Sequence, residues 1–145
     1  YLQTFDNNKD IIWDASKAAY TPDIVVIYLG TNDFSTAQQP NEEYFRKNYI
    51  RILKSIKANY GENIPVLCMG SNADPHLYDY IRSAVVASGL SNVSFMTIGR
   101  GAHNYEDELG ASWHPNYQGH IKVASCMIPY ISTLTGWSME EKAYK

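Results

Sequence analysis

Two short polar blocks in this sequence contain residue types that can take part in catalysis. The first, "GTND", spans residues 30–33, and the second, "WHPN", spans residues 113–116. The side-chain amide of Asn32 can donate N–H groups to a negatively charged oxygen. The imidazole of His114 can act as a general base near neutral pH. An oxyanion donor and a base are parts that acyl transfer requires besides its nucleophile.

Each block also fits an ordinary structural role, so its local context matters. "GTND" follows the apolar run "DIVVIYLG", and Asn and Asp are common turn residues. Pro115 biases His114 toward extended backbone, and Asn116 can cap a following helix. We therefore expect the imidazole to project from a fixed loop, where it can serve as a base or simply bond a backbone carbonyl.

Three apolar runs predict buried strands, at residues 23–30, 64–70 and 92–99. Each run is rich in β-branched residues and none alternates cleanly, which is typical of strands covered on both faces of a parallel sheet. Because ligands of open parallel sheets bind at the carboxyl ends of the strands, both polar blocks should lie at one rim of this sheet.

Helical periodicity separates the apolar runs. The first helix is expected after Asn41, and the second runs from an N-cap at Asp74 to a stop at Gly89. The last helix is expected from Asn116 to Gly136.

For the last helix, we expect Pro129 to kink or divide it. One face of that helix is predicted to carry the apolar residues Tyr117, Ile121, Ala124 and Ile128.

The alternation of strands and helices predicts the α/β class, as a three-layer α/β/α sandwich around a parallel sheet. Three strands make a thin sheet, so one edge is expected to stay open unless missing residues or a partner chain cover it.

Composition limits the function. The 145 residues are 45% hydrophobic and 19% charged, which predicts one globular domain. The net charge of −3, without a basic stripe, argues against nucleic acid, and no apolar run approaches the roughly 20 residues of a membrane span. No metal or nucleotide motif is present, so neither a metal ion nor another cofactor is expected. Cys68 and Cys126 are predicted to be buried thiols rather than a disulfide.

The two blocks, one after a strand and one before the final helix, resemble the SGNH (GDSL-type) hydrolase superfamily. The wider phrases "PDIVVIYLGTNDFS" and "LGASWHPNYQGH" are most similar to carbohydrate esterase family 2, whose members remove acetyl groups from plant cell-wall polysaccharides. The resemblance covers roughly residues 20–134 and implies a flavodoxin-like SGNH fold with serine-type esterase activity.

The resemblance also implies roles for individual residues. Asn32 is the expected oxyanion donor, and Gly30 is expected to shape the oxyanion loop beside the substrate. His114 is the expected base that activates a serine. Trp113 is expected to contribute to catalysis through its carbonyl and to line the sugar site with its ring. Asp33 is expected to hold its loop by bonding backbone amides.

The nucleophile is the first departure from the superfamily pattern. The superfamily serine lies in an N-terminal "GDS"-like block, which this sequence lacks, and Ser71 in "GSNAD" follows the wrong strand. The resemblance therefore implies that residues 1–145 are the C-terminal part of a single SGNH domain that lacks its N-terminal strand or strands. Such a chain should be inactive unless the missing segment or a partner chain completes the sheet and the site.

The acid of the triad is the second departure. Many members place an aspartate three residues before the histidine, where this chain has Ala111. Some members of carbohydrate esterase family 2 orient the histidine with the backbone carbonyl of the preceding residue, here Trp113, which stabilises an imidazolium less than a carboxylate does. Asp107 or Glu108 folding back toward His114 is the alternative.

By resemblance, the substrate is an acetylated polysaccharide or oligosaccharide such as xylan, and the location is secreted or periplasmic. The alternative is a non-catalytic carbohydrate-binding or structural remnant of the same fold. A flavodoxin-like binder of small molecules would leave the paired blocks unexplained.

Overall fold

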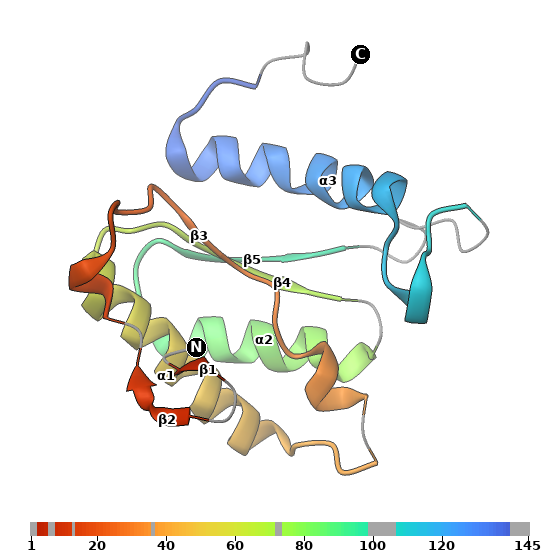
Figure 1. Cartoon of the computed structure of the whole chain (residues 1–145), viewed down its shortest axis with the longest axis horizontal. Helices are drawn as coiled ribbons and strands as arrows, with labels where there is room; N and C mark the ends of the chain where they lie inside the picture. The colour runs from red at the N-terminus through yellow and green to blue at the C-terminus, as the bar shows by residue number, and fades with distance from the viewer. Residues whose placement is uncertain are drawn as a thin grey trace.

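A parallel sheet forms the centre of the fold. The computed structural model describes residues 3–5, 8–12, 14–35, 37–71, 74–98 and 107–139. Among these, three parallel strands lie in the order β3-β4-β5 (Figure 1), namely β3 (Val25–Ile27), β4 (Val66–Gly70) and β5 (Val93–Thr97). Each strand lies inside one of the predicted apolar runs and is shorter than it. The predicted positions and the parallel direction are confirmed.

The central strand β4 is buried on both faces. Val66 and Cys68 contact one apolar cluster, and Leu67 and Met69 contact the other. Since successive side chains of a strand point to opposite faces, a strand between two helical layers needs apolar residues at every position. This requirement explains why its sequence shows no alternation.

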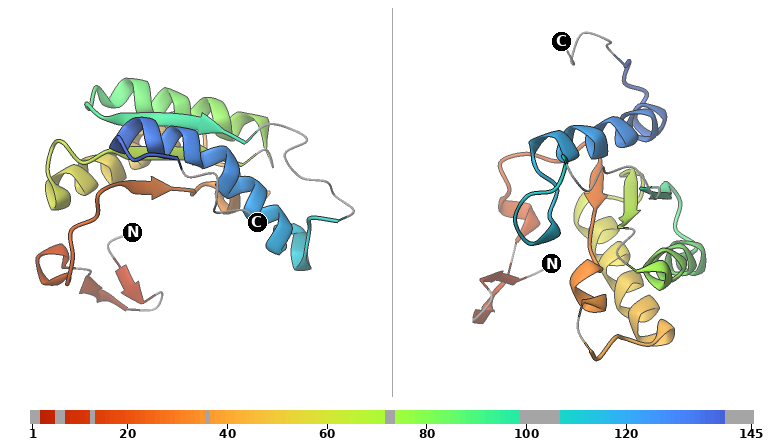
Figure 2. Two further views of the ribbon diagram at one scale, coloured as in Figure 1. Left: turned by 90° about the horizontal axis from the view of Figure 1, so that it is seen from above. Right: turned by 90° about the vertical axis from the view of Figure 1, so that its right-hand side faces the viewer.

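Helices cover both faces of the sheet. The helices α1 (Glu42–Tyr60) and α2 (Pro75–Ser88) lie on one face, and α3 (Tyr117–Thr135) lies on the other (Figures 1 and 2). The predicted three-layer α/β/α sandwich is therefore confirmed. None of the helices in the described part of the chain combines the length and apolarity needed to cross a membrane.

The predicted helix ends are also confirmed. Asn41, Asp74 and Asn116 accept hydrogen bonds from backbone N–H groups in the first turns of α1, α2 and α3. Gly89 and Gly136 follow α2 and α3 in the left-handed conformation, which terminates a helix at little cost for glycine.

The predicted buried face of α3 is wrong. The buried positions are Gly119 and Val123, and the partly buried residues that continue this stripe against the sheet are Met127, Ile131 and Leu134. The predicted stripe began at Tyr117, which is 76% exposed. A shift of two residues turns the face by about 200° around the helix. The helix carries two apolar stripes, and the sequence alone did not indicate which one meets the sheet.

Pro129 does not divide α3, which runs without interruption past it. Both Pro129 and Ser125, whose carbonyl would otherwise accept the missing N–H, are exposed. Water can therefore satisfy that carbonyl, so the loss of one helical hydrogen bond is tolerated.

Two further features differ from expectation. A hairpin of β1 (Gln3–Phe5) and β2 (Asn8–Ile12) precedes the sheet, although no strand was predicted there. Both cysteines are free, but only Cys68 is buried, and burial raises the pKa of its thiol to about 12. Cys126 is exposed because it lies outside the buried stripe of α3.

A buried lysine joins the end of α1 to the start of β4. Lys57 is 3% exposed, and its Nζ donates to the carbonyls of Glu62 at 2.8 Å and Ile64 at 2.6 Å. Burial lowers the pKa of the Lys57 ammonium. The two carbonyl contacts compensate for part of the lost hydration, so the side chain fixes the turn that leads into the central strand.

Replacing Lys57 by methionine should destabilise the fold. Lys57→Met keeps the aliphatic stem but leaves the two carbonyls without their donor, so we expect a loss of roughly 2–4 kcal/mol in the free energy of unfolding. Lys54→Met, on an exposed position of the same helix, should change it by less than about 0.5 kcal/mol. Urea unfolding of both variants measures the difference, and equal losses would contradict the assigned role.

Candidate active site

The two polar blocks lie at the same end of the sheet. Residues Thr31–Phe34 form a short 3-10 turn, η2, after β3, and residues Ala111–Trp113 form another, η3, before α3. Both turns lie on the side to which the strands point in Figure 1, and both face the viewer in the right-hand view of Figure 2. The topology thus places at one end of the sheet two segments that are distant in sequence, as expected for a site at the carboxyl ends of the strands.

A buried glycine shapes the first turn. Gly30 has φ 111°, and a Cβ there would lie 2.6 Å from Cδ1 of Leu77 and 3.2 Å from Cζ of Phe45. Only glycine fits both this backbone conformation and this close approach. Gly30 therefore positions the turn, and its expected contact with substrate stays a prediction.

The turn presents Asn32 and Asp33 to solvent. The carbonyl of Asn32 accepts from the N–H of Ser35 at 3.3 Å and from its Oγ at 2.9 Å, while the N–H of Asp33 donates to the carbonyl of Gly30 at 3.0 Å. These backbone contacts close the turn, and no bond from the Asp33 carboxylate to a backbone amide is recorded among the described residues. Both side chains are exposed, which leaves the Asn32 amide accessible to a substrate oxygen.

Asn32 and Asp33 form one wall of an open hollow of about 430 Å³. The other lining residues are Gln38, Pro40 and Tyr44. We call this space the Tyr44 hollow. Sequence reasoning missed Tyr44 and Gln38, because an aromatic residue near a helix start has no distinctive spacing to reveal its exposure.

A hydroxyl pair ties the first turn to the central strand. Oγ1 of Thr31 lies 2.9 Å from Oγ of Ser71, which follows β4 and is 9% exposed. Ser71 is therefore buried and hydrogen-bonded. The pair links the ends of β3 and β4 directly beside Asn32.

The histidine lies in a loop that closes on itself. The N–H of Gly110 donates to the carbonyl of His114 at 2.7 Å, and the N–H of Asn116 donates to the carbonyl of Glu108 at 2.8 Å. Inside the loop, Ser112 has φ 53°, a left-handed conformation that is uncommon for a residue with a side chain. These contacts hold the loop from which His114 projects.

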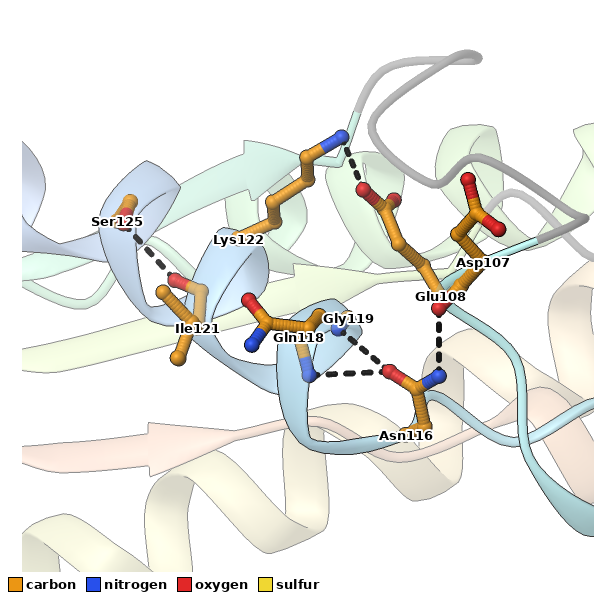
Figure 3. A network of polar contacts seen from close by, with 8 residues as sticks. All are labelled: Asp107, Glu108, Asn116, Gln118, Gly119, Ile121, Lys122 and Ser125. Carbon is orange, nitrogen blue, oxygen red and sulfur yellow. Dashed lines mark hydrogen bonds and ion pairs between the residues drawn. The ribbon is translucent and has the colours of Figure 1, made fainter.

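Asn116 joins this loop to α3 (Figure 3). Its Oδ1 accepts from the N–H groups of Gln118 at 3.0 Å and Gly119 at 3.1 Å, and its Nδ2 donates to the carbonyl of Asp107 at 2.7 Å. A Cβ at Gly119 would lie 2.5 Å from the carbonyl oxygen of Glu108. The absence of a side chain at Gly119 therefore lets the first turn of α3 pack directly on the loop.

The carbonyl that faces the imidazole belongs to Ala111. Nδ1 of His114 lies 3.2 Å from that oxygen, whereas the Trp113 carbonyl was expected in this role. The 3-10 turn returns the chain after three residues, so it places the Ala111 carbonyl below the ring. A carbonyl oxygen only accepts, so this contact requires the proton on Nδ1 and leaves the lone pair on Nε2. The predictions for the Trp113 ring lie outside the described side chains.

The carboxylate alternative is not observed for Glu108. Its side chain is buried and forms an ion pair with Lys122 of α3 (Figure 3). The pair directs the Glu108 carboxylate toward α3, and the alternative expectation for Asp107 stays a prediction.

No group of three His, Cys, Asp or Glu side chains that could hold a metal ion occurs within the described ranges. His76 and His120 are exposed, and His103 lies outside the described residues.

The sequence profile of the family described as "GDSL-like Lipase/Acylhydrolase" matches residues 1–127. The chain belongs to this family. The family identification agrees with the resemblance of the "GTND" and "WHPN" blocks.

Relatives of this GDSL-family chain include the "Cellulase/esterase CelE" of Acetivibrio thermocellus, which is 31% identical over 86% of this chain and 16% of its own length. The "Acetylxylan esterase / glucomannan deacetylase" of Cellvibrio japonicus is 26% identical over 90% of this chain and 38% of its own length. The chain thus spans well under half of either relative.

A solved structure shares the fold of the GDSL-family chain. The acetyl xylan esterase Est2A from the rumen bacterium Butyrivibrio proteoclasticus superposes with a TM-score of 0.70 at 20% identity, and the match covers 88% of this chain and 40% of that one. The α/β architecture is therefore that of an SGNH-like domain.

Alanine at Gly30 should destabilise this domain more than alanine at a glycine in open space. Gly30→Ala adds backbone strain and a clash with Leu77, so we expect a loss of roughly 2–5 kcal/mol. Gly89 also has positive φ, but nothing lies within 4 Å of a Cβ there, so Gly89→Ala should cost only about 1–2 kcal/mol. Thermal unfolding compares the two, and similar losses would show that the close approach at Gly30 is unimportant.

Alanine at Asn116 should loosen the histidine loop as well as the helix. Asn116→Ala removes a helix cap and the bond to the Asp107 carbonyl, so we expect a loss of about 1–3 kcal/mol. Asn41→Ala removes the cap of α1 alone and should cost about 1 kcal/mol. Amide hydrogen exchange should accelerate at Gly110 and His114 in the first variant only. Unchanged exchange rates at these two amides would show that the Asn116 contacts do not keep the loop ordered.

Proposed function

We propose that this chain supplies the oxyanion donor Asn32 and the base His114 of a carbohydrate O-acetyl esterase. The observation that carries the proposal is the placement of both blocks at one end of the parallel sheet (Figures 1 and 2), where each is fixed by its own backbone contacts. Membership of the GDSL family supports this chemistry, as do two relatives, one a cellulase/esterase and the other an acetylxylan esterase / glucomannan deacetylase.

The proposed reaction follows the serine esterase pattern. A serine hydroxyl from outside these 145 residues attacks the acetyl carbonyl, and Nε2 of His114 accepts its proton. The Asn32 amide donates to the oxygen that becomes negatively charged. Collapse transfers the proton to the sugar oxygen and leaves an acetyl-serine. Water, deprotonated by the same imidazole, then releases acetate and restores the serine.

The contact between His114 and Ala111 sets the tautomer that this reaction needs. A proton on Nδ1 keeps Nε2 available for the serine. A neutral carbonyl stabilises the imidazolium less than an aspartate would. Acetylated xylan or a related polysaccharide is the proposed substrate, in a secreted or periplasmic protein, and a further segment or partner chain is proposed to complete the sheet.

Alanine at Asn32 should slow hydrolysis without unfolding the protein. Removal of one oxyanion donor lowers kcat by about 10²–10³-fold. Because the Asn32 side chain is exposed, its removal should leave the stability of the fold nearly unchanged. Acetate release from acetylated xylan and from 4-nitrophenyl acetate, measured with the natural full-length protein, tests this expectation. His114→Ala should lower kcat by at least as large a factor as Asn32→Ala.

The control is His76→Ala, which removes an exposed imidazole from α2 and should leave both rates unchanged. If Asn32→Ala and His114→Ala turn over both esters like the unaltered protein, the esterase proposal fails. A non-catalytic carbohydrate-binding or structural role would then account for the fold.

A further inference from the structure

We propose that the Tyr44 hollow is a subsite for the sugar ring that carries the acetyl ester, with Tyr44 as its stacking platform. This inference rests on the proposed function. Asn32 lines the hollow and is also the proposed oxyanion donor, so a ligand in the hollow lies beside the group that would receive the ester oxygen.

Tyr44 is exposed although its backbone is firmly held. The side chain is 65% exposed. Its N–H donates to Oδ1 of Asn41 at 2.9 Å, and its carbonyl accepts from Nδ2 of Asn48 at 2.9 Å. A ring with two side-chain torsions on a fixed helix loses little entropy when a ligand packs on it. Exposure of a large ring on a rigid backbone therefore suits a contact surface.

The opposite wall of the hollow is also rigid. Asn32 and Asp33 belong to η2, which ends at the buried Phe34. The Phe34 ring packs edge-on against the rings of Phe45 and Tyr80, with centroids 5.6 Å apart in each pair. The wall that carries the two polar side chains is thus anchored in the core.

The loop between these walls is clamped by Gln39. Its Nε2 donates to the carbonyl of Phe34 at 3.1 Å and to Oδ2 of Asp74 at 3.3 Å. These bonds fix the segment that carries Gln38 and Pro40 to both η2 and the start of α2. The shape of the hollow is therefore set before a ligand arrives, which reduces the entropy that binding costs.

The chemistry of the lining matches a sugar. A pyranose ring has faces of C–H groups, which pack on an aromatic ring, and edges of hydroxyl groups, which bond carboxylates and amides. Tyr44 provides the first kind of surface, and Asp33 and Gln38 provide the second.

Size and position also favour the sugar over the acetyl group. The volume of about 430 Å³ lies within the range of small-molecule sites and far exceeds what a two-carbon acyl group fills. Another hollow, of about 570 Å³, includes Asp14, Ser16, Lys17 and Asn59 in its lining. None of its lining residues is aromatic, and it lies by the carboxyl end of α1, away from Asn32.

Removal of the Tyr44 ring should weaken the use of saccharide esters only. For the natural full-length protein, Tyr44→Ala is expected to raise KM for an acetylated xylo-oligosaccharide about five- to tenfold. Its kcat/KM for ethyl acetate, whose small leaving group is neither a sugar nor an aromatic ring, should stay within about twofold. Tyr44→Phe keeps the ring and should retain the KM of the unaltered protein. Tyr20→Ala, which removes a 77% exposed tyrosine that does not line the hollow, is the matched control.

The outcomes separate this inference from the proposed function. If 4-nitrophenyl acetate is hydrolysed and His114→Ala stops it, but Tyr44→Ala leaves the KM for the oligosaccharide unchanged, the subsite is wrong and the esterase proposal stands. Equal losses in kcat/KM on the oligosaccharide and on ethyl acetate, or the same loss in Tyr44→Phe as in Tyr44→Ala, also overturn the stacking role. If neither ester is hydrolysed, the esterase proposal itself fails.

Discussion

The burial of β4 on both faces is the constraint on which the rest of the fold depends. Its side chains enter one apolar cluster with α1 and α2 and another with α3. Because β4 pairs in parallel with β3 and β5, its position also sets where both neighbouring strands end. The loops that follow those ends carry the polar residues, so the core determines the place of the chemistry before any polar contact contributes.

The two halves of the candidate site are held by different forces. The turn that carries Asn32 is fixed by steric contact at Gly30 and by the Thr31–Ser71 hydroxyl pair. The loop that carries His114 is fixed by backbone hydrogen bonds and by the Asn116 side chain. Close packing tolerates few substitutions, whereas a hydrogen-bonded loop depends on its backbone path more than on most of its side chains.

The sequence predicted the elements whose signals are local. Strand positions and helix caps such as Asp74 and Asn116 depend on residues close in the chain, and these were correct. The buried face of α3 was not, because two apolar stripes compete and only the sheet selects one. The Ala111 carbonyl was missed because the left-handed backbone of Ser112 has no sequence signature. Tyr44 was missed since exposure is a property of the whole surface.

The close approach of Gly119 to the Glu108 carbonyl packs the histidine loop directly on α3, so the two segments form one rigid unit. That unit rests on the sheet through apolar side chains, among them Val123 against Met96 and its neighbours. The position of the imidazole relative to the sheet, and so to the oxyanion donor at its end, therefore depends in part on how closely α3 packs on this layer. Larger or smaller side chains in this layer would move α3 away from or toward the sheet. His114 would move with the helix, and the hydrogen bonds within its loop would be kept.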